Sequence, residues 1–360
     1  MKLTVSMRSL ASALRQLGRV ARKSDAKVTK LSIVAHRPGM AMLSASDAKS
    51  GVWMSVWIPV EQHQPWVGEI ALPSEQMAAI IATAQTPDLE LAHDENGTRI
   101  TSASAEWNLS PIDLSAVHGS PDTGGRKTLF SCEPEVLARG IASVEHSVAS
   151  ETARFTMTGL LVESSKSGVR FVCTDGRRLA IRTINCVPGS HGDVLLPRQA
   201  IQSMTFDGAT KVEVQASRNH VTVNWFKDEL PVAMLTAALL EGKFPAYREV
   251  LPKEPAHGCV HQIESVVSAI KQVACVSELN RVDVEYQPGK VVFSSSSSYG
   301  KAQVEVACEH AISAKFAANS QYLFEALAAV EGQTATISLS KQPSVIIESQ
   351  DLFQLVMPLS

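Results

Sequence analysis

The chain has 360 residues, of which 45% are hydrophobic and 19% are charged, and its formal net charge is −3. This composition excludes a disordered chain, and the length allows two or three domains with adequate cores. No apolar run approaches the roughly 18 residues that are needed to span a bilayer, which excludes a membrane-embedded protein. Residues 1–5 predict a strand at the start of the chain and contain no hydrophobic segment of a secretory signal.

A helix-like apolar pattern begins at Leu10 and returns twice along the chain. In each copy three apolar residues stand at offsets of four and three, which places them on one face of a helix. The copies are Leu10, Leu14 and Leu17; Leu137, Ile141 and Val144; and Val266, Ile270 and Val273. A second, shorter pattern recurs in step with the first, as Met77 and Ile80, Ile201 and Met204, and Leu323 and Ala326. Two patterns that repeat at nearly one period predict three copies of one structural unit.

Alternating apolar stretches between and after these helices predict antiparallel strands in every copy. The clearest hairpin is in the second copy, where residues 212–214 and 221–225 flank a turn-like segment. Two helices and several strands per copy predict an α+β fold, with both helices packed on one face of an antiparallel sheet. Segments rich in glycine and proline separate the copies and predict domains at residues 1–122, 123–252 and 253–360.

The first helix carries a basic face opposite its leucines. Between Arg8 and Lys30 there are seven basic residues and one acidic residue, in a chain that is slightly acidic overall. The basic residues assigned to this face are Arg8, Arg15, Arg19, Arg22 and Lys23, and Arg139 and Lys271 stand away from the apolar faces of the corresponding later helices. Such segregation favours a polyanion bound on one face, although a solvated helix surface explains an isolated stripe equally well.

The polyanion expected at this face is a DNA duplex contacted through its phosphates. No zinc-finger, homeodomain or heptad-linked basic pattern is visible, so the sequence predicts no element that reads bases. Aromatic residues make up only 5% of the chain and do not interleave with the basic run, which argues against stacking on single strands. Contact with duplex phosphates is independent of sequence and sensitive to salt.

The six cysteines and ten histidines form no pattern of metal ligands or catalytic residues. No CxxC or Cys/His ligand spacing occurs, so we expect reduced cysteines in a cytoplasmic protein, without a metal or another cofactor. The sequence also lacks HExxH, GxSxG, P-loop and paired-carboxylate spacings, which argues against an enzyme. A repeat-built scaffold that binds proteins but never meets DNA is a further alternative.

Three later segments carry a family resemblance. They are TDGRRLA at residues 174–180, EGKFPAYREVLP at 241–252 and VMPLS at 356–360. Together and in this order they resemble the bacterial sliding clamp, the β subunit of DNA polymerase III, and the resemblance spans the whole chain. It implies a non-catalytic processivity factor that encircles duplex DNA and tethers the replicative polymerase and other clamp-binding proteins in replication and repair. It also implies three clamp domains per chain and two chains joined head to tail in a closed ring. A specialised or accessory clamp paralogue is the alternative within the family.

The resemblance further implies a groove that takes short peptides from polymerases, clamp-loader subunits and repair factors. Apolar side chains would offer an adaptable slot, and arginines would hold oxygen atoms of the peptide. The residues carried over to this groove are Met157, Thr174, Gly176, Arg177, Arg178, Leu179, Pro245, Val250, Leu355, Val356, Met357, Pro358 and Leu359. Glu249 stands where many family members have a basic residue, and the tail that ends at Leu359-Ser360 is shorter than that of some members. We expect both differences to affect which peptides the groove prefers.

By the same resemblance, Trp107 of the first domain would meet Cys275 and Val276 of the third domain across two symmetric interfaces. A tryptophan packed on small apolar residues is a plausible anchor for a dimer. Trp107 is explained equally well as a core residue of its own sheet.

Overall fold

The computed structural model describes residues 1–21, 27–121, 124–150, 152–204, 207–252, 258–308, 314–340 and 344–359, with the backbone alone at 152–154. The chain forms two compact units, each built from two stretches of sequence. Unit 1 contains Met1–Ala138 and Cys186–Leu239, and unit 2 contains Arg139–Asn185 and Leu240–Ser360. The division into three domains that the repeats suggest stays a prediction. None of the helices in the described ranges is long and apolar enough to cross a membrane.

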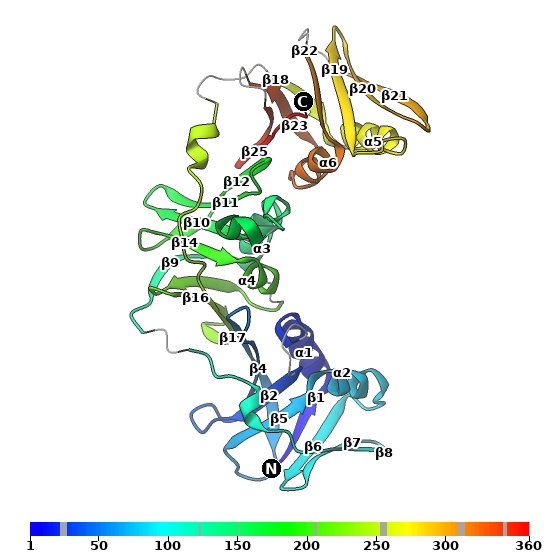
Figure 1. Ribbon diagram of the computed structural model, residues 1–360. Coiled ribbons are helices and arrows are strands. Elements are labelled where there is room, and N and C mark those ends of the chain that lie inside the picture. Colours follow the sequence, from blue (N-terminus) through cyan, green and yellow to red (C-terminus); the bar gives the residue numbers. More distant parts are fainter. Residues whose placement is uncertain are drawn as a thin grey trace. The chain divides into compact units, whose positions relative to one another are not determined.

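Unit 1 is built on a 13-stranded antiparallel sheet with helices packed against it (Figure 1). Its strands are β1 (Lys2–Ser6), β2 (Val28–Ile33), β3 (Met40–Asp47), β4 (Val52–Gln62), β5 (Gly68–Pro73), β6 (Asp88–Asp94), β7 (Gly97–Ser102), β8 (Ala105–Leu109), β9 (Lys127–Cys132), β13 (Val187–Pro188), β15 (Lys211–Ala216), β16 (His220–Lys227) and β17 (Leu230–Ala238). The unit also contains α1 (Met7–Ala21), α2 (Ser74–Thr83), α4 (Arg198–Ser203), β14 (Gly192–Pro197) and the 3-10 helix η1 (Leu114–Ala116). Helix α3 (Pro134–Ala142) runs from unit 1 into unit 2.

The main path of this sheet runs β13-β9-β15-β16-β17-β4-β1-β6-β7-β8. Strand β17 pairs with β4, with Ala233 opposite Val56, so strands from two of the predicted domains form one continuous ladder. The predicted hairpin of β15 and β16 is confirmed, with Val212 opposite Trp225. Strand β8 ends the path, and within the described residues its outer edge has no paired strand.

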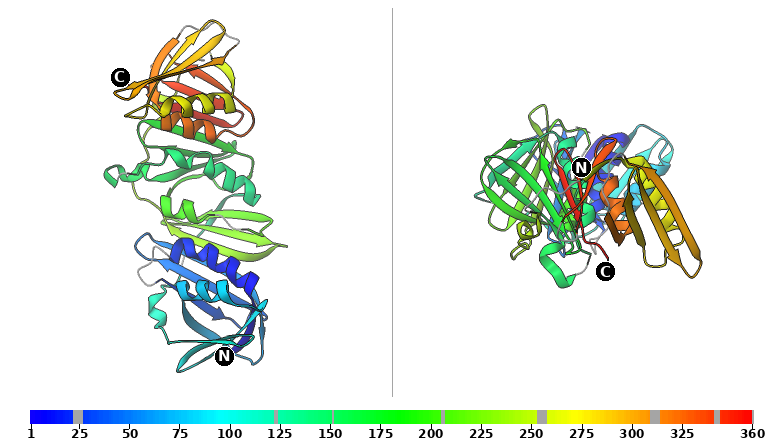
Figure 2. Two further views of the ribbon diagram at one scale, coloured as in Figure 1. Left: turned by 90° about the vertical axis from the view of Figure 1, so that its right-hand side faces the viewer. Right: turned by 90° about the horizontal axis from the view of Figure 1, so that it is seen from above.

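Helix α1 lies across β3 and β4, and α2 lies beside it (Figure 2). Leu10 and Leu17 are fully buried, as the apolar pattern predicts. Leu14 is only half-buried, because it lines a hollow of about 520 Å³ between the two helices, together with Ala11 and Ile81. The predicted apolar face is therefore confirmed for Leu10 and Leu17, whereas Leu14, at the margin of that face, lies next to α2.

Unit 2 contains two groups of antiparallel strands and two further helices that lie against each other. Its strands are β10 (Gly159–Ser165), β11 (Gly168–Thr174), β12 (Arg178–Ile184), β18 (Gly258–Gln262), β19 (Arg281–Gln287), β20 (Lys290–Ser297), β21 (Gly300–Ala307), β22 (Ala314–Asn319), β23 (Thr334–Leu339), β24 (Val345–Ser349) and β25 (Leu352–Val356). Its helices are α5 (Ile263–Ala274), α6 (Ser320–Ala328) and the 3-10 turns η2 (Glu145–Ser147), η3 (Thr152–Met157) and η4 (Tyr247–Val250).

Within unit 2 one run of paired strands is β10-β11-β12-β25-β24-β23-β18, and a separate sheet has the order β21-β20-β19-β22. Side chains from both sheets and from α5 and α6 form one hydrophobic core. In the two units together, the other predicted helical patterns are confirmed by burial of Leu137, Ile141, Val144, Val266, Ile270 and Val273, and of Ile201, Met204, Leu323 and Ala326. The predicted α+β fold with antiparallel sheets is confirmed as well.

Candidate functional site

The candidate site is built where the end of the chain pairs with the strand that follows the TDGRRLA segment. β12 and β25 are antiparallel neighbours, with Arg178 opposite Val356 and Leu179 opposite Leu355. One step further, the Met357 amide donates a hydrogen bond of 2.9 Å to the Arg177 carbonyl oxygen. This ladder fixes the chain end beside the turn at residues 174–178.

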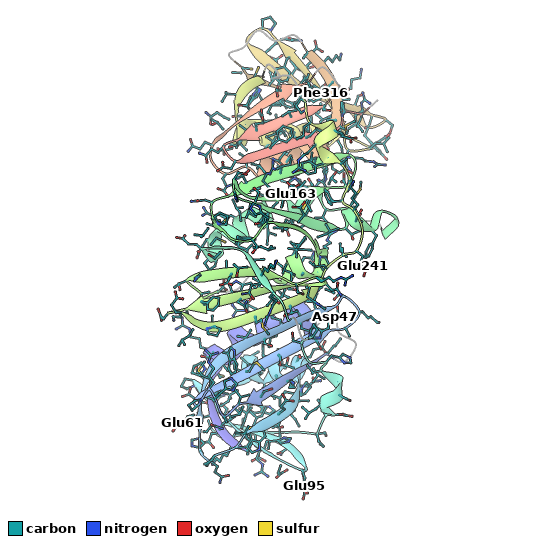
Figure 3. All side chains as sticks on the ribbon, turned by 90° about the vertical axis from the view of Figure 1, so that its left-hand side faces the viewer. Asp47, Glu61, Glu95, Glu163, Glu241 and Phe316 are labelled. Carbon is teal, nitrogen blue, oxygen red and sulfur yellow. The ribbon has the colours of Figure 1, made fainter. Side chains whose placement is uncertain are left out.

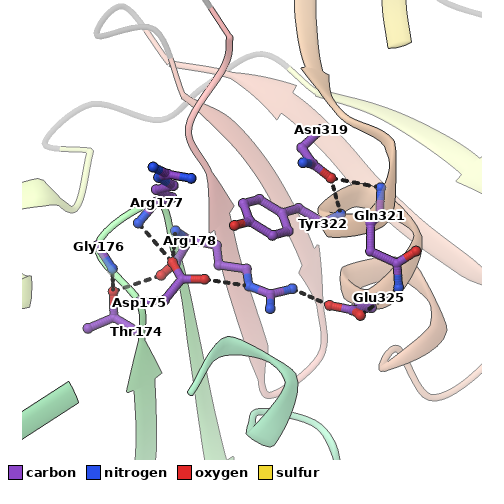
Figure 4. Close-up of polar contacts among 9 residues, drawn as sticks. All are labelled: Thr174, Asp175, Gly176, Arg177, Arg178, Asn319, Gln321, Tyr322 and Glu325. Carbon is purple, nitrogen blue, oxygen red and sulfur yellow. Dashed lines mark hydrogen bonds and ion pairs between the residues drawn. The ribbon is translucent and has the colours of Figure 1, made fainter. Parts of the chain in front are cut away.

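Side-chain hydrogen bonds hold the turn between β11 and β12 in shape (Figure 4). Asp175 Oδ1 accepts from the backbone amides of Arg177 and Arg178 at 2.8 and 3.0 Å. Thr174 Oγ1 donates to the Arg178 carbonyl at 2.7 Å and accepts from the Gly176 amide at 3.1 Å. Gly176 has a φ of +83°, a left-handed conformation that favours glycine. The Asp-Gly pair therefore encodes a specific turn that presents Arg177 to solvent.

Arg178 makes its main contacts inside unit 2. Its Nε donates to Asp175 Oδ2 at 3.0 Å, and its Nη1 donates to Glu325 Oε2 on α6. The guanidinium also lies over the Tyr322 ring, with Cζ 4.2 Å from the ring centroid, and the side chain is 11% exposed. The sequence assigned both arginines to peptide binding, but the structure uses Arg178 as a strut between β12 and α6, as Figure 4 shows.

The strut changes the protonation of two neighbouring groups. Burial alone would raise the pKa of Glu325, but hydrogen bonds from Arg178 and Gln321 outweigh it and lower that pKa. Burial, and then the positive charge of Arg178, lower the pKa of His146 to about 4. At neutral pH the cluster therefore contains an ionised Glu325 beside Arg178 and a neutral imidazole.

The end of the predicted second domain is tied to β10 through the buried carboxylate of Glu163, which Figure 3 labels. Tyr247 Oη donates to Glu163 Oε2 at 2.7 Å, and Arg248 Nη2 donates to Glu163 Oε1 at 2.7 Å. Arg170 adds an ion pair at 3.5 Å. Burial, with the bond to Glu163, raises the pKa of Tyr247 to about 12. These contacts hold η4, which ends at Val250.

The predicted groove residues divide into a buried set and an accessible set. Thr174, Leu179, Leu355 and Val356 are buried, so they support the surface from beneath. Gly176 and Arg177 are exposed, and Met157, Pro245, Arg178 and Pro358 are partly exposed. Val250, Met357 and Leu359 are large apolar residues with 52%, 45% and 39% of their surface exposed. The Leu359 amide donates to the Ala317 carbonyl at 2.7 Å, which ties the chain end to β22.

Sequence reasoning missed three residues near this set. Tyr322 stacks on Arg178, and Ser344 Oγ lies 3.9 Å from Met357 Sδ. Phe155, next to Met157 on η3, is 53% exposed. Only Phe155 could have been found from the sequence, because it stands two residues before the predicted groove residue Met157. The other two are brought in by strand pairing and helix packing, which local patterns do not show.

The basic face of α1 lies where the sequence predicted it. Arg8, Arg15 and Arg19 are exposed, whereas Arg22 and Lys23 lie outside the described residues. The Arg19 carbonyl accepts from Gln199 Nε2 at 3.0 Å, which places α4 against α1. Arg198 begins α4 and is exposed, and it is a basic residue that the sequence analysis missed. The basic surface of unit 1 therefore draws on two helices.

The two basic residues predicted in later helices belong to unit 2 and are both exposed. Arg139 lies on α3, and Lys271 lies on α5. Lys271 Nζ is 4.9 Å from the centroid of the Phe324 ring on α6, so an aromatic neighbour helps to orient its charge.

The residues predicted at the dimer interface lie on an edge strand of unit 1 and at the end of a helix in unit 2. Trp107 is half-buried on β8, opposite Ile100 of β7. Cys275 is exposed at the end of α5, and Val276 is half-buried. The sequence missed two neighbours of this second group, Leu279 and Tyr299, whose side chains are 83% and 88% exposed. Exposed apolar groups of this size are typical of an interaction surface.

One group of residues has the composition of a metal site, although no ligand spacing is visible in the sequence. Cys259, His261 and Cys308 are buried in the core of unit 2, and their possible ligand atoms lie within 4.8 Å of one another.

Comparison with known proteins extends over the whole chain. Residues 131–246 match the family model of the DNA polymerase III beta subunit, central domain, and residues 248–360 match that of its C-terminal domain. The beta sliding clamp of Salmonella typhimurium is 24% identical over 385 residues, covering 100% of both chains, and that of Caulobacter vibrioides is 24% identical over 373 residues, covering 98% of this chain and 97% of the relative.

Solved structures of the same kind share the fold. The DNA polymerase sliding clamp of Bacillus subtilis matches with a TM-score of 0.88 at 19% identity, covering 100% of this chain and 99% of that one. The DNA polymerase III subunit beta of Pseudomonas aeruginosa matches with a TM-score of 0.87 at 20% identity, covering 100% of both chains. Because the two family models together match well over half of the sequence, the chain belongs to the DNA polymerase III beta subunit family.

Proposed function

We propose that this protein is a DNA sliding clamp: a non-catalytic processivity factor that encircles duplex DNA and tethers the polymerase during replication. The observation that carries this function is membership of the DNA polymerase III beta subunit family, together with full-length similarity to sliding clamps. The family match disfavours both an enzyme and a scaffold that never meets DNA. The role places the protein in the cytoplasm, where bacterial DNA is replicated.

The basic helices would supply the DNA-facing surface. Arg8, Arg15 and Arg19 project from α1 on the side away from its core contacts, and Arg198 extends this surface on α4. Arg139 and Lys271, together with Arg22 and Lys23, complete the proposed set. Lysine and arginine near phosphates release counterions and attract a duplex without fixing its position. A surface of this kind suits a protein that slides, because the attraction is the same at every base pair.

Two copies would close a ring through their exposed sheet edges. β8 ends the sheet of unit 1, and β21 ends the four-stranded sheet of unit 2. A strand edge has unpaired amide and carbonyl groups, which a second chain satisfies by adding its own edge strand. Trp107 of one copy would then pack on Cys275 and Val276 of the other. Each of three domains per chain would contribute to the ring, with six domains around the duplex.

Partner proteins would bind the predicted groove through short peptides of the QLxLF kind. Met157, Val250, Met357 and Leu359 offer accessible apolar atoms, and Arg177 offers a guanidinium that faces solvent. DNA polymerase and clamp-loader subunits are the partners that the family implies. Arg178 would act from behind this surface, because Asp175 and Glu325 hold its guanidinium.

The function is tested by topological retention on DNA. The full chain, loaded onto nicked circular DNA with the clamp loader of its own organism and ATP, should stay bound through gel filtration at high salt. Cutting the circle once should release it, because only a closed ring is held by the topology of its track. Failure to be retained on the circle, or equal retention after the cut, would contradict the sliding-clamp function.

A charge-reversed variant separates the topological hold from electrostatic attraction. With Arg15→Glu and Arg19→Glu, affinity for short linear duplex should fall, and the slope of log affinity against log salt should become shallower by roughly two. Retention on intact circles should persist once the variant has been loaded. An unchanged salt slope would show that these arginines do not face the DNA.

The peptide site is tested at the chain end. Replacing both Met357 and Pro358 by alanine should weaken binding of a QLxLF-like peptide by roughly tenfold or more, which is about 1.4 kcal/mol. The reason is the loss of exposed apolar surface and of the rigid turn beside the Arg177 carbonyl. Val260→Ala is a matched control, since Val260 is 61% exposed on β18 and lies outside the predicted groove. Fluorescence polarisation that finds equal affinities for both variants would refute the groove assignment.

A further inference from the structure

Two cysteines and a histidine meet in the core of unit 2. Cys259 and His261 are alternate residues of β18, so the period of the strand points both to its inner face. Their exposed fractions are 0% and 3%. Cys308, which follows β21, is 5% exposed and completes the group. One candidate ligand atom from each residue lies within 4.8 Å of the other two.

Among the described residues, the core around this group is mostly apolar, and one phenol contacts it. Tyr286 on β19 is 5% exposed, and its hydroxyl lies 3.0 Å from His261 Nε2. The two rings meet edge to face, with centroids 5.7 Å apart and an angle of 62° between their planes. Valine, alanine and leucine side chains from both sheets and from α5 and α6 make up most of the surrounding core. An imidazole placed in such a core needs fixed partners, because burying an uncompensated polar group costs free energy.

The donor set selects a particular class of ion. Two thiolates and an imidazole are soft or intermediate ligands, which bind Zn²⁺ and Cu⁺ and do not suit Mg²⁺ or Ca²⁺. With Zn–S near 2.3 Å and Zn–N near 2.0 Å, ligand atoms in a tetrahedral site lie about 3.5–3.8 Å apart. The separations here are therefore within about 1 Å of those that a metal ion requires, a distance that small side-chain rotations cover.

We propose that Cys259, His261 and Cys308 form a buried site for one thiophilic cation, Zn²⁺ or Cu⁺, with Tyr286 orienting the His261 ring. Metal-bound histidines commonly use their second ring nitrogen in a hydrogen bond that fixes the ring, and Tyr286 is placed for that role. The ion would link β18 to the end of β21, which belong to different sheets. It would thus cross-link the two sheets in the core beneath α5 and α6. The site would be a structural metal site, because its ligands are closed to solvent.

The site is tested on tag-free, full-length protein that has been reduced and freed of metal. In one arm the protein is dialysed against Zn²⁺, and in the other Cu⁺ is supplied from its bicinchoninate complex. Plasma mass spectrometry should then find about one tightly held ion per chain in at least one arm. That ion should raise the melting temperature, since a ligand that binds the folded state stabilises it. Co²⁺ in place of Zn²⁺ should give a thiolate-to-metal charge-transfer band.

Cysteine variants locate the ion. Cys259→Ser and Cys308→Ser should each lose the bound ion, the rise in melting temperature and the charge-transfer band, while Cys186→Ser, which changes a partly buried cysteine of unit 1, should keep all three. If the core variants fail to fold, the charge-transfer band in Cys186→Ser decides the question. Absence of any held ion, or equal metal content in Cys259→Ser, would each overturn the proposal. The ring and the peptide groove are not involved in any of these outcomes.

Discussion

Replacing Arg178 by methionine should destabilise unit 2 by about 2–3 kcal/mol. The substitution keeps most of the apolar stem but leaves the carboxylates of Asp175 and Glu325, 15% and 29% exposed, without the guanidinium that pairs them. Removing one partner of a buried ion pair typically costs about 3–5 kcal/mol, and the partial exposure of these groups reduces that figure. The Tyr322 ring also loses its stacked cation.

Hydrogen exchange measures this effect in the elements that the strut joins. Amides in α6 and at the start of β12 should exchange roughly 30-fold faster in Arg178→Met, which corresponds to about 2 kcal/mol. Arg177→Met is the matched control, because the Arg177 side chain is exposed and its loss should change stability by less than about 0.5 kcal/mol. Unchanged exchange in α6 of Arg178→Met would show that the strut contributes nothing to the stability of unit 2.

A double substitution separates the loss of pairing from the loss of packing. The double variant Arg178→Met with Glu325→Leu lacks both the cation and one of the carboxylates that the single variant leaves unpaired. It should therefore be more stable than Arg178→Met alone. The recovery should be visible as slower exchange in α6 than in the single variant. Additive losses would mean that Arg178 acts through its contact with the Tyr322 ring, and that its pairing with Glu325 contributes little.

Most of the helices and hairpins could be predicted from sequence because their signals are local. The apolar spacing of Leu137 and Ile141, for example, reflects the face that α3 buries, and Val144 is buried just after the helix ends. Leu14 fits the same pattern but lies at the margin next to α2, and a single-helix pattern does not reveal a neighbouring helix. Local periodicity therefore predicts which elements form, and it is less informative about which elements meet.

The candidate site likewise contains local features that the sequence predicts and long-range contacts that it does not. The Asp175-Gly176 turn is visible in sequence because its hydrogen bonds join residues within four positions. The ion pair of Arg178 with Glu325 is not visible in sequence, since it joins residues 147 positions apart. Cys259 lies on β18 and Cys308 follows β21, 49 positions later, so a search for closely spaced ligands does not find them. Long-range pairs of this kind depend on the packing of whole sheets.

The last prediction concerns closure of the ring. Replacing Trp107 by alanine should weaken the dimer by roughly a thousandfold in its dissociation constant. An aromatic anchor at the centre of an interface contributes about 2 kcal/mol, and a head-to-tail dimer contains the contact twice, so the total approaches about 4 kcal/mol. Sedimentation with fluorescence detection at nanomolar concentration measures the change. Trp66→Ala is the control, because Trp66 is a half-buried tryptophan in the same unit that lies on neither β8 nor its neighbours.

The half-buried position of Trp107 makes a second measurement necessary. Trp107 also pairs with Ile100 across β7 and β8, so its loss removes packing within its own sheet. A role confined to that sheet would lower the urea midpoint of the monomer and leave the dimer intact at nanomolar concentration, and this result would reject the interface assignment. An interface role predicts the reverse, since β8 is an edge strand that the described part of a single chain pairs on one side only. The two roles can therefore be distinguished by measuring stability at several protein concentrations, because only the dimer contact is subject to mass action.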